Sequence, residues 1–251
     1  MSLFVAFRKE WMELIRSYRL MVVVIVLLFF GLTSPLLAKF TPELLKLIPT
    51  GGISIQMPPP TLMDAVGQYI KNMAQFGILL ALLLTMGAIA QEKDKGTAAM
   101  MLVKPLPRGA FLAAKFLGLA AMFAVSLAVA GIAAYYYTLL LFEAMDIVHW
   151  LVLNALLFVY VLVFVAITLC CSTLTKSQAA AGGIALGLLI FLGLIGSIPG
   201  LGKYLPGELT TWGTRLMSGD TTPSWAALGI SLGLIVVPLL AAWIIFRNQE
   251  I

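Results

Sequence analysis

The chain has 251 residues, of which 61% are hydrophobic and only 11% are charged. A soluble domain carries about 25% charged residues, so this composition excludes a water-soluble protein and predicts one whose solvent is lipid. The net charge of +5 comes from lysines and arginines that flank apolar runs. That placement argues against a nucleic-acid partner and is typical of a membrane protein.

Residues 2–19 are predicted to form an amphipathic helix ahead of the first apolar run. Apolar side chains recur at three- and four-residue steps, and charged side chains fill most of the other side. The apolar face carries Leu3, Phe4, Phe7, Trp11, Leu14, Ile15 and Tyr18, and the polar face carries Arg8, Lys9, Glu10, Glu13, Arg16 and Ser17. Such a helix suits the inner membrane interface, although a cytoplasmic extension of the first span would have the same spacing.

Six apolar runs are long enough to cross the hydrocarbon core, which takes about 20 helical residues. They cover approximately residues 20–38, 73–90, 113–141, 150–173, 179–201 and 225–246. The runs are continuous rather than alternating, which excludes a transmembrane barrel and requires helices. We therefore expect an all-α integral membrane protein, in which residues 1–251 form a single transmembrane domain with six transmembrane helices and an N-terminal interfacial helix.

The distribution of positive charge predicts the orientation. With six spans both termini share a side, and that side holds eleven lysines and arginines against five on the other. By the positive-inside rule, both termini and the loop at residues 91–112 are cytoplasmic. The expected location is the cell membrane, as a multi-pass protein.

The spans contain almost no ionisable groups, each of which costs about 2.5–3.5 kcal/mol to insert. Lys115 lies at the inner end of the third span, and His149 precedes the fourth as an interfacial residue. The chain has no HExxH motif, and SIPGLGKY lacks the residues of a phosphate-binding loop. Cys170 and Cys171 are adjacent and are interpreted as packing thiols. We expect no catalytic residue, no metal site and no directly bound cofactor.

Two further local patterns predict structure. The segment TLMDAVGQYIKNM follows three prolines and is expected to form a helix leading into the second span, with Thr61 as its cap. Glycine pairs four residues apart occur at Gly183 and Gly187, Gly196 and Gly200, and Gly229 and Gly233. Such pairs allow helices to approach closely, either within the chain or between subunits.

The stretch AIAQEKDKGTAAMMLVKPLPRGAFLAAKF, residues 88–116, gathers many of the charges of the chain into one cytoplasmic loop. Gly96 can form a turn, Thr97 can cap a short helix over residues 98–103, and Pro105 with Pro107 can give a stiff exit. A loop that only fixes the orientation requires its lysines and arginine, but not its acidic residues, its Gly-Thr pair or its prolines. The pattern favours a rigid element that contacts a partner.

The loop, the six spans and the N-terminal helix together resemble the permease subunit of ABC-2-type transporters. The matching loop features are Glu92, Gly96 with Thr97, the apolar helix, Pro105, Arg108 and Lys115, and the ending FRNQEI is also similar. The resemblance covers the layout of the whole chain, whereas its specific residues are concentrated at 92–115.

The resemblance implies an ATP-driven exporter built from two permease subunits, identical or similar, each docked to a separate ABC ATP-binding subunit that holds ATP and Mg. The residues expected to couple to that subunit are Glu92, Lys93, Asp94, Gly96, Thr97, Met100, Pro105, Arg108 and Lys115. The interfacial helix, with Phe4, Phe7, Arg8, Trp11 and Arg16, resembles the connecting helix of these permeases and would contact membrane lipid. The sequence does not predict a substrate-binding residue. The alternatives are a stand-alone secondary transporter or channel, and a non-transporting membrane assembly protein.

Overall fold

The computed structural model describes residues 3–46, 58–96 and 107–248, and every regular element in these ranges is helical. The elements are α1 (Leu3–Arg16), α2 (Arg19–Lys46), α3 (Leu62–Thr85), α4 (Ala90–Asp94), α6 (Arg108–Leu141), α7 (Ile147–Leu174), α8 (Gln178–Gly196), η1 (Gly202–Tyr204), α9 (Gly207–Met217) and α10 (Trp225–Asn248). In the described part of the chain, six segments are long and apolar enough to span a membrane: α2, α3 with α4, α6, α7, α8 and α10. The predicted fold class and the number of spans are confirmed.

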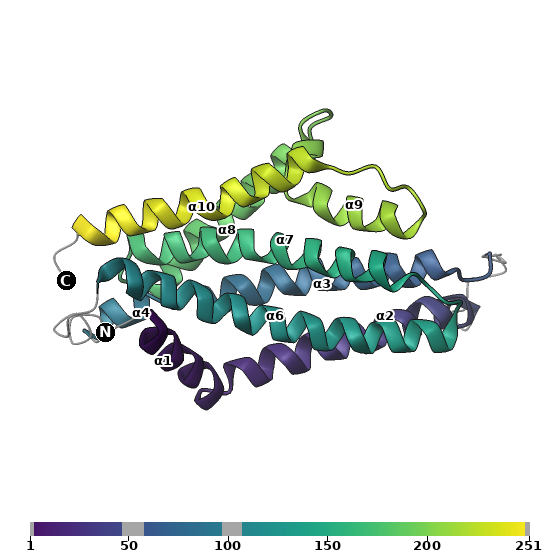
Figure 1. The fold of residues 1–251 in the computed structure, drawn as a ribbon, viewed down its shortest axis with the longest axis horizontal. Coiled ribbons are helices and arrows are strands. Elements are labelled where there is room, and N and C mark those ends of the chain that lie inside the picture. Colours follow the sequence, from purple (N-terminus) through teal and green to yellow (C-terminus); the bar gives the residue numbers. More distant parts are fainter. Residues whose placement is uncertain (1–2, 47–57, 97–106, 249–251) are drawn as a thin grey trace.

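The core of the bundle consists of α2, α3, α6 and α7, which lie side by side along its length (Figure 1). The rings of Phe30 and Phe76 stack at 3.6 Å between α2 and α3. At Gly31 the backbone of α2 approaches α6 so closely that a Cβ would lie 2.7 Å from the carbonyl oxygen of Ala130. By contrast, only 17% of the residues in the most apolar stretch of α8, and 17% in that of α10, are buried. Most of the surface of these two helices is therefore left to lipid or a partner.

α1 folds back from α2 and packs on α6 at the end of the bundle that also holds α4 (Figure 1). The reversal occurs at Tyr18, whose φ of 59° lies in the left-handed region that few side chains adopt. α1 is helical as predicted, and it buries Ala6, Glu10 and Leu14. Glu10, which the sequence places on the polar face of this helix, is thus buried with Ala6 and Leu14 on the side that meets α6.

Several helix ends differ from the apolar runs. α2 continues to Lys46 although it contains Pro35 and Pro42. α3 begins at Leu62 as one continuous helix, and Thr61 forms a capping box with Asp64, which confirms the predicted cap. α8 stops at Gly196 rather than 201, since the chain turns there. Hydropathy marks the lipid-facing length of a helix, whereas capping and turn residues decide where the helix ends.

Two of the three glycine pairs do not mediate helix packing within the chain. A Cβ at Gly183, Gly187, Gly229 or Gly233 would meet nothing within 4 Å. At these four positions, therefore, the glycines do not allow close packing of helices within the chain, which was one of the two alternatives. The face of α8 that carries two of them is open.

The segment between α8 and α10 contains the short helix α9, which lies along α7 (Figure 1). Leu209, Trp212 and Leu216 pack there with Leu156 of α7. At this end Arg215 donates a hydrogen bond of 2.7 Å to the carboxylate of Glu208 and another of 2.7 Å to the hydroxyl of Ser224. These bonds fasten both ends of α9 to the start of α10.

Candidate functional site

The candidate site lies where α3 ends and α4 begins, because the sequence places the coupling residues there. The helix is interrupted at residues 86–89, and the buried side chain of Ser172 on α7 satisfies the interrupted backbone. Its hydroxyl oxygen accepts hydrogen bonds from the backbone N–H groups of Ile89 at 3.0 Å and Ala90 at 2.9 Å. The same hydroxyl donates to the carbonyl oxygen of Met86 at 2.9 Å. One side chain thus fixes the angle at which α4 leaves the bundle.

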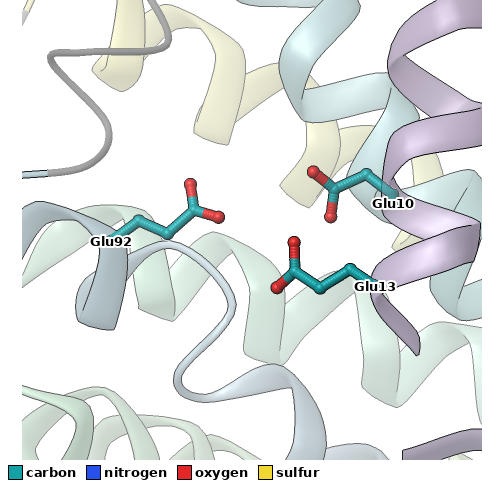
Figure 2. Close-up of side chains that lie close together, drawn as sticks. All are labelled: Glu10, Glu13 and Glu92. Atoms are coloured by element: carbon teal, nitrogen blue, oxygen red, sulfur yellow. The ribbon is translucent and has the colours of Figure 1, made fainter. Parts of the chain in front are cut away.

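Five charged side chains from α1, α4 and α6 meet beside this joint, and we call them the inner ion-pair cluster: Lys9, Glu10, Glu13, Glu92 and Lys115. The ammonium nitrogen of Lys115 lies 2.7 Å from a carboxylate oxygen of Glu92 and 3.1 Å from one of Glu10. Lys9 pairs with Glu10 at 2.9 Å and with Glu13 at 3.1 Å. The carboxylates of the three glutamates point toward one another across the space between α1 and α4 (Figure 2).

Burial makes this cluster energetically important. The side chain of Lys115 is only 5% exposed, that of Glu10 is 11% exposed and that of Glu92 is 17% exposed. A charge removed from water is costly unless it is paired, and breaking such a pair costs about 3–5 kcal/mol. The contacts of Lys115 therefore hold α1 and α4 to the first turns of α6.

Carboxylate oxygens of Glu10, Glu13 and Glu92 lie within 4.8 Å of one another, a spacing that also suits a cation site. Here each of the three already pairs with an ammonium group: Glu13 with Lys9, and both Glu10 and Glu92 with Lys9 and Lys115. Two lysines would repel an added cation. The arrangement is consistent with an ion-pair cluster rather than a metal centre.

The pKa values of Lys9 and Glu13, the two more exposed members of the cluster, are shifted from their ordinary values. Burial alone would raise the pKa of Glu13, but the hydrogen bond and positive charge of Lys9 outweigh it, so the pKa of Glu13 is lowered. Burial alone would lower the pKa of Lys9, but the charges and hydrogen bonds of Glu10 and Glu13 raise it. Both shifts favour the charged forms at neutral pH.

Two more predicted residues join helix ends at this face. Arg108 begins α6 and donates hydrogen bonds to the carbonyl oxygens of Phe246, at 2.8 Å, and Arg247, at 2.7 Å, at the end of α10. Lys93 of α4 donates to the carbonyl oxygen of Thr173 near the end of α7, at 2.6 Å. Cations placed on carbonyls at helix C-termini are favourable because those ends carry partial negative charge.

The structure brings together some of the predicted coupling residues and leaves others apart. Glu92 and Lys115 meet in the cluster, whereas Asp94 is exposed and Gly96 ends α4 with a φ of 68° that favours glycine. Thr97, Met100, Pro105 and the predicted helix over 98–103 lie outside the described residues.

The residues predicted for the N-terminal helix lie mostly on its outer surface. Phe4 and Arg8 are exposed, Arg16 is exposed at the end of α1, and Phe7 and Trp11 stack at 6.3 Å. Sequence reasoning missed Glu10 and Ser172 as parts of the site. The sequence signal for Glu10 was its helical spacing of four residues from Ala6 and Leu14, which places the three side chains on one side of α1. Charged side chains on solvated helices often have the same spacing.

Nearly the whole chain is similar to known membrane proteins. Residues 4–251 match the family model described as an ABC-2 family transporter protein. The chain belongs to the ABC-2 transporter family. An uncharacterized transmembrane protein of Bacillus subtilis (strain 168), YxlG, is 24% identical to this ABC-2 protein over 247 residues, covering 97% of this chain and 95% of the relative.

Membership of the family gives the ABC-2 protein a general role. It is a multi-pass membrane permease of an ABC transporter, a transport subunit that is not itself catalytic. A permease of this family works with an ABC ATP-binding partner. The family therefore favours the transporter interpretation over the stand-alone carrier and the assembly protein.

Proposed function

We propose that this permease is half of a dimeric, ATP-driven exporter, and that a separate ATP-binding subunit drives it through α4 and the segment that follows α4. The observation that carries the proposal is the buried pairing of Lys115 with both Glu92 and Glu10. A force applied to α4 reaches α6 and α1 directly through these contacts.

The fixed angle of α4 supports the same role. A short helix of five residues has little stability of its own. Ser172 and Lys93 tie it to α7, and Glu92 ties it to α6. A helix held on two sides can transmit a push, whereas a free loop would absorb it. Gly96 then turns the chain out of α4 at a φ that other residues tolerate poorly.

The open face of α8 supports pairing of two permeases. Gly183 and Gly187 are exposed on it, with room for a second helix to approach. In lipid, small residues allow close backbone contact that stabilises association. We place the dimer contact on this face.

The docking proposal is tested by reversing an exposed charge of α4. Asp94 is exposed, so Asp94→Lys should leave folding intact but lower the amount of ATP-binding subunit that co-purifies with tagged permease by several-fold. Lys71→Glu, an exposed charge reversal within α3 and distant from α4 along the helix, is the matched control and should retain the subunit. Equal recovery of the ATP-binding subunit with both variants would refute docking at α4.

The dimer contact is tested by cysteine cross-linking in a chain that carries Cys170→Ala and Cys171→Ala. Gly187→Cys should give a disulfide-linked dimer in the membrane. Ile25→Cys, on the exposed surface of α2, should stay monomeric under the same oxidation. Cross-linking at Ile25 alone would move the contact away from α8.

A further inference from the structure

A groove of about 440 Å³ runs between the first turns of α6 and the second half of α10. It is lined by Gly109, Leu112, Ala113, Phe116, Leu117, Val236, Leu239, Leu240 and Trp243. Its walls are open to the outside of the bundle, since Leu117 is 42% exposed and Leu240 is 52% exposed. A volume of several hundred Å³ with apolar walls is typical of a ligand site. In a membrane this groove faces lipid.

The two walls of the groove, α6 and α10, are joined at one end. There the rings of Phe111 and Phe246 stack at 5.5 Å, and Arg108 bonds to the last carbonyl groups of α10. From this joint α10 diverges from α6 toward the other end of the molecule (Figure 1). A molecule could therefore enter the groove sideways from the bilayer.

Positive charge lies beside this end of the groove, whose own lining residues are uncharged. The guanidinium group of Arg247 lies 5.8 Å from the ring of Trp243, which forms a wall of the groove. The ammonium group of Lys93 lies 5.6 Å from the ring of Phe246, whose carbonyl oxygen accepts a hydrogen bond from Arg108. The site thus combines an apolar slot with a neighbouring cationic end and an amphipathic tryptophan between them.

We propose that the groove binds one anionic phospholipid, with an acyl chain along α6 and α10 and its phosphate at Arg247. Basic pockets between transmembrane helices at the cytoplasmic side suit anionic headgroups, and tryptophan prefers the depth at which the headgroup meets the chain. Gly109 contributes to the shape, because a Cβ there would lie 3.1 Å from the indole nitrogen of Trp243. A bound lipid would hold α10 against α6 where the two helices have few direct contacts of their own.

Charge favours a lipid over a second copy of the chain in this groove. A protein helix could fill the apolar slot, but it would also have to supply an anionic group that pairs with Arg247. An anionic phospholipid supplies the apolar chain and the phosphate in one molecule. The open glycine face suited to a second permease lies on α8 instead.

Fluorescence of Trp243 provides a direct test. The full chain is reconstituted in phosphatidylcholine vesicles that contain increasing fractions of brominated phosphatidylglycerol or brominated phosphatidylcholine, which quench tryptophan on contact. The difference between the wild type and Trp243→Phe isolates the signal of Trp243. We expect half-maximal quenching of Trp243 at a several-fold lower fraction of the anionic lipid than of the neutral lipid.

Two variants and a control decide the outcome. Arg247→Gln should bring the two quenching curves together, and Ala113→Phe should fill the slot and reduce quenching by both lipids. Ala128→Phe occupies a separate outward-facing groove farther along α6 and should leave the preference unchanged. Coincident curves in the wild type, or an undiminished preference in Arg247→Gln, would overturn the proposal. Protection of Trp243 from both lipids would assign the groove to a second copy of the chain.

Discussion

Lys115 on α6 and Glu92 on α4 lie 2.7 Å apart across 23 residues of sequence, and the same ammonium group reaches Glu10 on α1 at 3.1 Å. One buried cation therefore connects three segments that the chain order separates. If α4 moves, either α1 and α6 move with it or charges are left unpaired in a poorly solvated site. This connection supports the proposed transfer of force through α4, and it predicts how particular substitutions will behave.

Lys115→Met should lower the free energy of unfolding by about 3–5 kcal/mol, because it leaves Glu10 and Glu92 buried without their shared cation. Thermal unfolding of the detergent-solubilised protein measures the change. Lys71→Met, at an exposed position, is the control and should leave the midpoint unchanged. Adding Glu10→Gln and Glu92→Gln to Lys115→Met should recover part of the loss, since no unpaired charge then remains. An unshifted midpoint in the single variant would contradict the buried-pair account.

Ser172→Ala should loosen the joint between α3 and α4. It removes the acceptor for the N–H groups of Ile89 and Ala90, and each unsatisfied buried group costs about 1–3 kcal/mol. Hydrogen exchange should become faster at these two amides. Ser126→Ala is a matched buried serine whose hydroxyl only bonds back to its own helix, at Met122, and it should have a much smaller effect. Equal exchange in both variants would remove Ser172 from the joint.

The pair of Lys9 and Glu13 should give stability that is flat near neutral pH and is lost on either side. The pKa of Glu13 is lowered, so its contribution is complete above its ordinary pKa and disappears as the pH falls through the lowered value. The pKa of Lys9 is raised, so its contribution is complete below its ordinary pKa and disappears as the pH rises through the raised value. Glu13→Gln should flatten the acid limb of the unfolding midpoint against pH. Because both side chains are partly exposed, the change should be small.

Gly31→Ala should destabilise the bundle by about 1–3 kcal/mol, because the added methyl group would overpack the contact between α2 and α6. The matched control is Gly67→Ala in α3, where a Cβ would meet nothing within 4 Å. There the substitution should be neutral or stabilising by up to about 1 kcal/mol, since alanine favours a helix. Unfolding midpoints that shift equally in the two variants would contradict the close approach of α2 and α6.

Much of the architecture could be predicted from local sequence. Hydropathy identified the six spans, and Thr61 after three prolines identified the start of α3, because both signals depend on residues close together in the chain. The exact helix ends were less predictable. α2 continues past its apolar run, and the break after α3 depends on a hydroxyl group supplied by α7.

By itself the sequence determined that this chain is a six-span, all-helical membrane protein with a charged segment after its second span, because lipid imposes its requirements on every residue of a span separately. Only the tertiary structure decided that Glu10 is buried, that Lys115 bridges α1 and α4, and that Ser172 fixes the joint. Helical periodicity places Glu10 among charged neighbours on α1 but does not say which helix covers it. The partner of a buried charge is set by the packing of helices distant in sequence, and it is this packing that brings Lys115 to Glu10, 105 residues away.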